Sequence, residues 1–147
     1  MLSIYDVFLK FILEAAIKRI IASEDVLWKE AIDFGNVPDA WIQFDGGEAF
    51  IEVDLNTERR IVLRKKFEKY MAFKESGRYR SVFPNCSFLV LVLTTTEERI
   101  ASLEQVTPSG EFWFCTMDEF LREKLTHEHW FTLDNFHALP VITKEKM

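Results

Sequence analysis

The chain has 147 residues, of which 48% are apolar, 29% charged and 14% aromatic, and its 18 basic and 24 acidic side chains give a formal net charge of −6. This length and apolar content predict one soluble domain over residues 1–147 and exclude a largely disordered chain. The longest apolar run, Phe88 to Leu93, is too short to span a membrane, and the N-terminus carries Asp6 and Lys10 rather than a signal-peptide pattern. We therefore expect a cytoplasmic protein with no membrane partner.

The chain contains two cysteines, Cys86 and Cys115, each inside an apolar stretch. Two thiols are too few for a disulfide framework or for a zinc site with four cysteine ligands. We expect both to be reduced thiols in the core.

The first half of the chain predicts a helix followed by a meander. Residues 2–22 repeat apolar positions at helical spacing, which favours an amphipathic helix. Residues 26–34 are typical of a strand. Residues 38–44 and 49–55 alternate as two strands of a hairpin around Asp45-Gly46-Gly47, since glycine accepts positive φ at little cost.

The second half predicts alternating helices and strands. The expected elements are a helix from an Asn56-Thr57 cap through Glu75, a central strand over 87–94, a helix over 95–105, a strand over 111–116 and a helix over 117–125. The tail from His129 to Ile142 either adds an edge strand or packs on the core. The fold class is therefore α/β (α+β), a mixed sheet with an antiparallel meander, flanked by helices.

Charge is segregated along the chain. Residues 57–80 hold nine basic and three acidic side chains, a local balance of +6, and the rest of the chain carries −12. A helix in this segment presents either a solvated surface with internal Glu/Lys pairs or a surface that attracts phosphate.

Acidic residues occur at both ends of the predicted hairpin. Asp39 opens one strand and Glu52 and Asp54 close the other, so the turn brings Asp39 toward Glu52. Converging carboxylates repel each other, and a shared divalent cation relieves this cost. Oxygen ligands favour Mg²⁺ or Mn²⁺, and Glu30 on the preceding strand is a further candidate ligand. Such a cation polarises a phosphoryl oxygen and activates water, as phosphodiester hydrolysis requires.

Each of these residues also has a structural alternative. Asp39 would satisfy backbone donors in a turn, and Glu52 would pair with Arg59, Arg60 or Lys66. The end of a strand and the start of a helix accept acids such as Asp54 and Glu58 without any function. Lys66 would be a solvated helix residue, Thr57 a helix cap and Tyr70 an aromatic at the edge of the core.

The linked pattern resembles the PD-(D/E)xK nuclease superfamily and, more specifically, the replication-relaxation family of plasmid and phage proteins. The resemblance covers residues 2–94 and is carried by Trp28-Lys-Glu30, Pro38-Asp39-Ala40, Phe50-Ile-Glu52-Val-Asp54, Thr57-Glu58 and Leu63-Arg-Lys-Lys66-Phe-Glu-Lys-Tyr70. It implies a restriction-endonuclease-like fold that acts on DNA with Mg²⁺ or Mn²⁺. It also implies metal ligands at Asp39, Glu52 and Glu30, with Asp54 assisting.

The sequence departs from the superfamily at the signature lysine. That lysine usually lies two residues after the acid, where this chain has Asp54. In some members the following helix supplies it, and Lys66 is the candidate here, with Lys65 second. The DNA backbone would be contacted by Arg59, Arg64, Lys65 and Lys69.

Two functions follow as expectations. One is metal-dependent hydrolysis of DNA. The other is a catalytically inactive nuclease-like domain that binds DNA or a protein partner in plasmid replication, phage regulation or counter-defence. The chain has no room for the family's N-terminal winged-helix-like region, so DNA binding would come from this domain, from a homodimer or from a partner. Activity requires that Lys66 reach Glu52.

Overall fold

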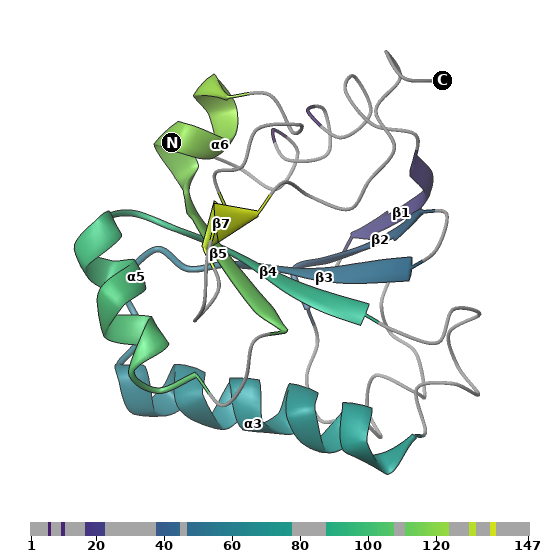
Figure 1. The fold of residues 1–147 in the computed structure, drawn as a ribbon, viewed down its shortest axis with the longest axis horizontal. Coiled ribbons are helices and arrows are strands. Elements are labelled where there is room, and N and C mark those ends of the chain that lie inside the picture. The colour runs from purple at the N-terminus through teal and green to yellow at the C-terminus, as the bar shows by residue number, and fades with distance from the viewer. Residues whose placement is uncertain are drawn as a thin grey trace.

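The computed structural model describes residues 17–22, 38–44, 47–77, 88–107, 111–123, 130–131 and 136–137, together with Asp6 and Lys10. They form a mixed seven-stranded sheet in which the strands lie in chain order from β1 to β7. Helices lie on both sides of this sheet (Figure 1). The predicted mixed sheet flanked by helices is thus confirmed. In the described part of the chain, no helix combines the length and apolarity needed to cross a membrane.

The first three strands form the antiparallel part of the sheet. Strand β1 (Ile17–Ala22) pairs with β2 (Ala40–Phe44), which pairs with β3 (Gly47–Val53). The predicted hairpin is confirmed, with Trp41 opposite Phe50, but its second strand covers Gly47–Val53 rather than residues 49–55. The prediction of a helix through residue 22 is wrong for residues 17–22. Three of these six residues are isoleucine, whose branched Cβ favours extended backbone, and pairing with β2 decides the outcome. The strand expected over 26–34 lies outside the described residues.

Two helical connections build the parallel part of the sheet. The chain runs through α3 (Arg60–Ser76), β4 (Phe88–Thr94), α5 (Glu97–Glu104) and β5 (Phe112–Thr116). Strand β4 pairs in parallel with both β3 and β5, and its side chains are almost all buried, as the unbroken apolar run predicts. Helix α6 (Met117–Arg122) and the short antiparallel strands β6 (Trp130–Phe131) and β7 (Phe136–His137) follow. Of the two alternatives for the tail, an edge strand or packing on the core, the described residues show the edge strand.

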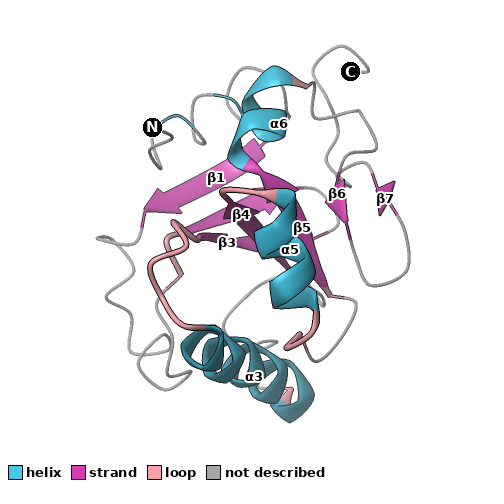
Figure 2. Cartoon of the chain, turned by 90° about the vertical axis from the view of Figure 1, so that its left-hand side faces the viewer, coloured by secondary structure: helices cyan, strands magenta, loops and turns pink. Residues whose placement is uncertain are grey.

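The main core lies between the sheet and α3. Buried aromatic rings of α3 pack on the sheet, for example Phe67 against Phe112, with ring centroids 4.8 Å apart. Helix α5 adds Ile100 and Leu103 to this core, while α6 lies on the opposite face of the sheet (Figure 2). On that opposite face Cys115 is a buried free thiol, and burial raises its pKa. Cys115 is thus the core thiol that its sequence context predicts.

Helix α3 begins later than its sequence predicts. Its N-cap is Arg59, which makes no side-chain capping hydrogen bond, and the expected Asn56-Thr57 cap is wrong. The reason is that Asn56 adopts a φ of 60° and its backbone N–H donates to Asp54 Oδ1 at 3.2 Å. Residues 54–59 therefore form a separate loop, hereafter the β3–α3 loop.

Candidate active site

Asp39 and Glu52 lie across from each other at one end of the sheet. The Asp39 N–H donates to the Ile51 carbonyl at 2.9 Å, and the Val53 N–H donates to Asp39 Oδ2 at 2.7 Å. The first bond extends the contact between β2 and β3 beyond Ala40, and the second holds the Asp39 side chain against β3, beside Glu52. Glu52 projects from the same face of β3 as Phe50, toward α3, and only 4% of it is exposed. The structure thus brings together the two acids that the hairpin predicts.

Helix α3 supplies two partners to Glu52. Lys66 Nζ donates to Glu52 Oε2 at 3.3 Å, and the Tyr70 hydroxyl donates to Oε1. Lys66 and Tyr70 are four residues apart and so lie on one side of the helix. The Lys66 side chain is 27% exposed, whereas Tyr70 is fully buried. Lys66 therefore links the buried carboxylate to the surface.

Tyr70 is a buried partner of Glu52 and not the aromatic at the edge of the core that the sequence predicts. The available signal was its place one helical turn after Lys66. Residues one turn apart share a side of the helix, and both of these side chains donate to Glu52.

Burial and neighbouring charge shift the protonation of this group. Burial raises the pKa of Glu52 to about 7; the Lys66 ammonium opposes the shift and the Asp39 charge adds to it. Burial also raises the pKa of Asp39, against the Val53 hydrogen bond and Lys66. Burial acts to lower the pKa of Lys66, but the carboxylates of Glu52, Glu58 and Asp39 outweigh it and raise that pKa. Both acids therefore bind a proton more readily than an exposed carboxylate, while the lysine stays charged.

Asp54 belongs to a different cluster. Its Oδ2 accepts from Thr94 Oγ1 at 2.7 Å and from Arg99 Nε at 2.9 Å, and its Oδ1 accepts from Arg99 Nη2 at 3.3 Å. Burial acts to raise the pKa of Asp54, but the hydrogen bonds from Arg99 and Thr94 hold that pKa below its ordinary value. We therefore assign Asp54 to a buried ion pair and not to the group around Glu52. Sequence reasoning did not identify Arg99, because nothing local marks a partner 45 residues away.

The donor set suits a hard divalent cation. Asp39 and Glu52 offer carboxylate oxygens from adjacent strands. The negative charge of Asp39 repels an ionised Glu52 and so raises its pKa, and a bound cation would relieve this repulsion. Mg²⁺ commonly uses one or two carboxylates and completes its shell with water and substrate phosphate. Within the described residues no group of three or more His, Cys, Asp or Glu side chains is placed to hold a metal ion. The further predicted ligand, Glu30, lies outside those residues.

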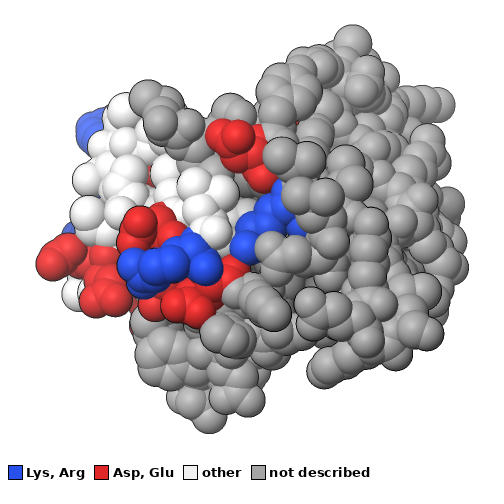
Figure 3. All heavy atoms as spheres, turned by 90° about the horizontal axis from the view of Figure 1, so that it is seen from above, with Lys and Arg blue, Asp and Glu red and all other residues white. Residues whose placement is uncertain are grey.

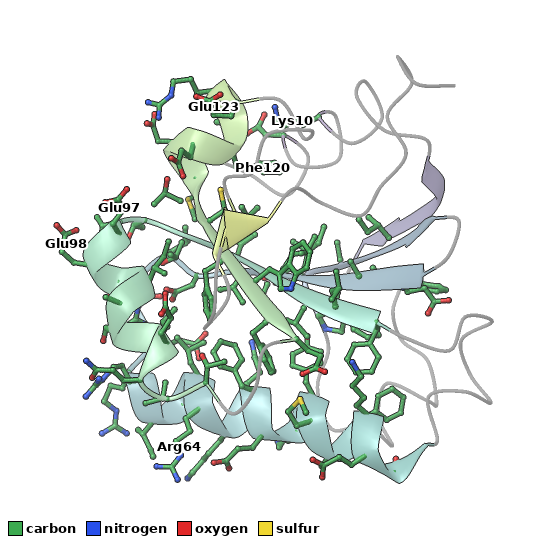
Figure 4. The ribbon with its side chains drawn as sticks, viewed as in Figure 1. Lys10, Arg64, Glu97, Glu98, Phe120 and Glu123 are labelled. Carbon is green, nitrogen blue, oxygen red and sulfur yellow. The ribbon has the colours of Figure 1, made fainter. Side chains whose placement is uncertain are left out.

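The predicted DNA-contacting residues, Arg59, Arg64, Lys65 and Lys69, are all exposed on or just before α3. Arg64 points away from the sheet (Figure 4) and pairs with the exposed Glu68 at 2.9 Å. Lys66 points the other way, toward Glu52, so one helix presents basic groups both to solvent and to the site. The face that carries α6 shows acidic groups around basic ones (Figure 3), in keeping with the ion pairs of Arg122 with Asp118 and Glu123.

No protein-family model, curated protein or solved structure matches this chain. We therefore infer the function from the chemistry of the site. The two acids can bind a cation or accept a proton, and the ammonium can neutralise an anion. All three groups lie at the end of β3, where the chain leaves the sheet.

Proposed function

We propose that this domain is a restriction-endonuclease-like protein that hydrolyses phosphodiester bonds in DNA with Mg²⁺ or Mn²⁺, in the manner of the PD-(D/E)xK nucleases. The observation that carries the proposal is the 3.3 Å contact between Lys66 Nζ and Glu52. The chain lacks a lysine two residues after Glu52, and helix α3 supplies one to the same carboxylate. The resemblance of these motifs to the replication-relaxation family favours a protein of plasmid or phage origin that acts on DNA.

Each residue of the site has a distinct role in this proposal. Asp39 and Glu52 would hold the cation, which when bound polarises a phosphoryl oxygen and activates water. Lys66 stays protonated and stabilises negative charge on the phosphate. Tyr70 is buried and fixes the orientation of the Glu52 carboxylate through its hydroxyl.

The outer surface of α3 would bind the DNA backbone. Arg59, Lys65 and Lys69 are exposed there and carry charge that phosphates attract. Binding through such groups releases counterions, so its affinity should fall steeply as salt rises.

A second function is favoured by the contacts of Glu52. Both of its oxygens already accept hydrogen bonds, from Lys66 and from Tyr70, which gives a self-sufficient network. A catalytically inactive domain with this network would bind DNA through α3. Alternatively, its acidic remainder would bind a basic protein partner in plasmid replication, phage regulation or counter-defence.

The Lys66→Met variant tests the nuclease function. Cleavage of supercoiled and single-stranded DNA with Mg²⁺ or Mn²⁺ should fall by about 100-fold or more, because the site loses its charge stabilisation. The control is Lys74→Met, which removes the same charge from the same helix at a lysine bonded instead to the Phe88 carbonyl and Glu111. This control should cleave like the wild type.

The nuclease function would be contradicted if the wild type cleaved neither supercoiled nor single-stranded DNA with Mg²⁺ or Mn²⁺. The binding function would then require DNA retention that weakens with salt, or capture of a basic protein. Equal cleavage by Lys66→Met and wild type would remove Lys66 from the reaction.

A further inference from the structure

One arginine holds both ends of the β3–α3 loop, the segment that joins the strand carrying Glu52 to the helix carrying Lys66. At the start of the loop, Arg99 donates to both carboxylate oxygens of Asp54, at 2.9 and 3.3 Å. At the end of the loop, Arg99 Nη2 donates to the Glu58 carbonyl at 2.8 Å. The guanidinium therefore ties the Asp54 side chain to the Glu58 backbone carbonyl, near the two ends of the loop.

The arginine is itself firmly placed. Its side chain is 9% exposed, and its backbone N–H donates to the Thr96 cap at the start of α5. Asp54 is fixed in turn to the end of β4, because its N–H donates to the Leu93 carbonyl at 2.7 Å and its Oδ2 accepts from Thr94. The loop is thus anchored to the end of β4 and the start of α5.

We propose that Arg99 is a positioning residue that sets the separation between Lys66 and Glu52 by clamping both ends of the β3–α3 loop. The clamp also places Glu58 beside the site, where its charge acts on both Asp39 and Lys66. A lysine cannot replace this arginine, since a single ammonium lacks the planar fork that reaches Asp54 and Glu58 together. The effect on DNA cleavage rests on the proposed function, but the positioning itself does not.

The positioning is measured by the coupling between Lys66 and Glu52. Urea unfolding of the Lys66→Met and Glu52→Gln single and double variants gives a coupling energy, which we expect to fall by more than about half in an Arg99→Lys background. As a second readout, the Kd for Mn²⁺ alone should weaken by about 10-fold or more, as when groups that orient metal ligands are changed. Arg122→Lys is the control, because it makes the same exchange in an exposed ion pair.

A loss of global stability with an unchanged coupling energy would overturn the proposal, since a merely structural role predicts that result. If Arg99→Lys does not fold, Asp54→Asn replaces it. That variant keeps the bond to the Glu58 carbonyl but removes the bidentate ion pair, and it too should weaken the coupling. A wild type that binds no Mn²⁺ would contradict the proposed function alone, and the coupling energy would still decide whether Arg99 positions Lys66.

Discussion

Asp54→Ala should lower the free energy of unfolding by about 3–5 kcal/mol, because it leaves the Arg99 charge buried without its carboxylate partner. The ion pair is almost fully enclosed, with side chains 9% and 2% exposed and an N–O distance of 2.9 Å. Thr94 also loses the acceptor of its hydroxyl. Urea denaturation at neutral pH measures the change.

The matched control is Asp118→Ala on α6. Asp118 pairs with Arg122 at the same distance of 2.9 Å, but these side chains are 81% and 61% exposed. Water screens such a pair, so we expect a loss below about 1 kcal/mol. Similar losses in the two variants would show that burial does not govern the Asp54–Arg99 pair.

Wild type should lose stability relative to Glu52→Gln by about 3 kcal/mol as the pH rises from about 4.5 to above 7. The sign follows from the raised pKa of Glu52, about 7 in the folded protein against an ordinary value of 4.5. Between these values the folded protein keeps a proton that the unfolded chain has released. The resulting stability is fully present below pH 4.5 and is lost as the pH rises through 7. Urea unfolding of both proteins across this range measures the difference.

Asp54 should behave in the opposite way on acidification. Its pKa is lowered by Arg99 and Thr94, so its contribution is present above its ordinary pKa and is lost as the pH falls through its lower folded-state value. The acid side of the stability profile thus reports Asp54, and the neutral side reports Glu52. A stability difference between wild type and Glu52→Gln that stays constant from acid to neutral pH would contradict the assigned environment of Glu52.

The hairpin that carries Asp39 and Glu52 is predictable because two alternating segments flank a turn signal. Turn residues between the two segments are enough to predict that the strand after Asp39 pairs with the strand that carries Glu52. The unbroken apolar run of β4 likewise requires cover on both faces. Local pattern was sufficient here because it reports burial directly.

Strand β1, Tyr70 as a partner of Glu52 and Arg99 as the partner of Asp54 were not predictable in the same way. The spacing of the isoleucines in residues 17–22 is compatible with a helix or with a strand. Pairing with the edge of β2 makes this segment a strand. Helical spacing placed Lys66 and Tyr70 in one row, but the packing of Phe67 and its neighbours against the sheet decides where that row points. Such choices depend on contacts between segments far apart in the chain.

Calorimetric titration of Mn²⁺ into wild type and Asp39→Asn, at a pH above the Glu52 pKa of about 7, tests the candidate site most directly. Asp39 is the better position to change, because it is only partly buried whereas Glu52 is enclosed by Lys66 and Tyr70. The control, Asp118→Asn, makes the same substitution at an exposed acid on α6. We expect saturable Mn²⁺ binding to wild type and Asp118→Asn that is lost in Asp39→Asn. Identical titrations for wild type and Asp39→Asn would contradict a metal site at Asp39 and Glu52.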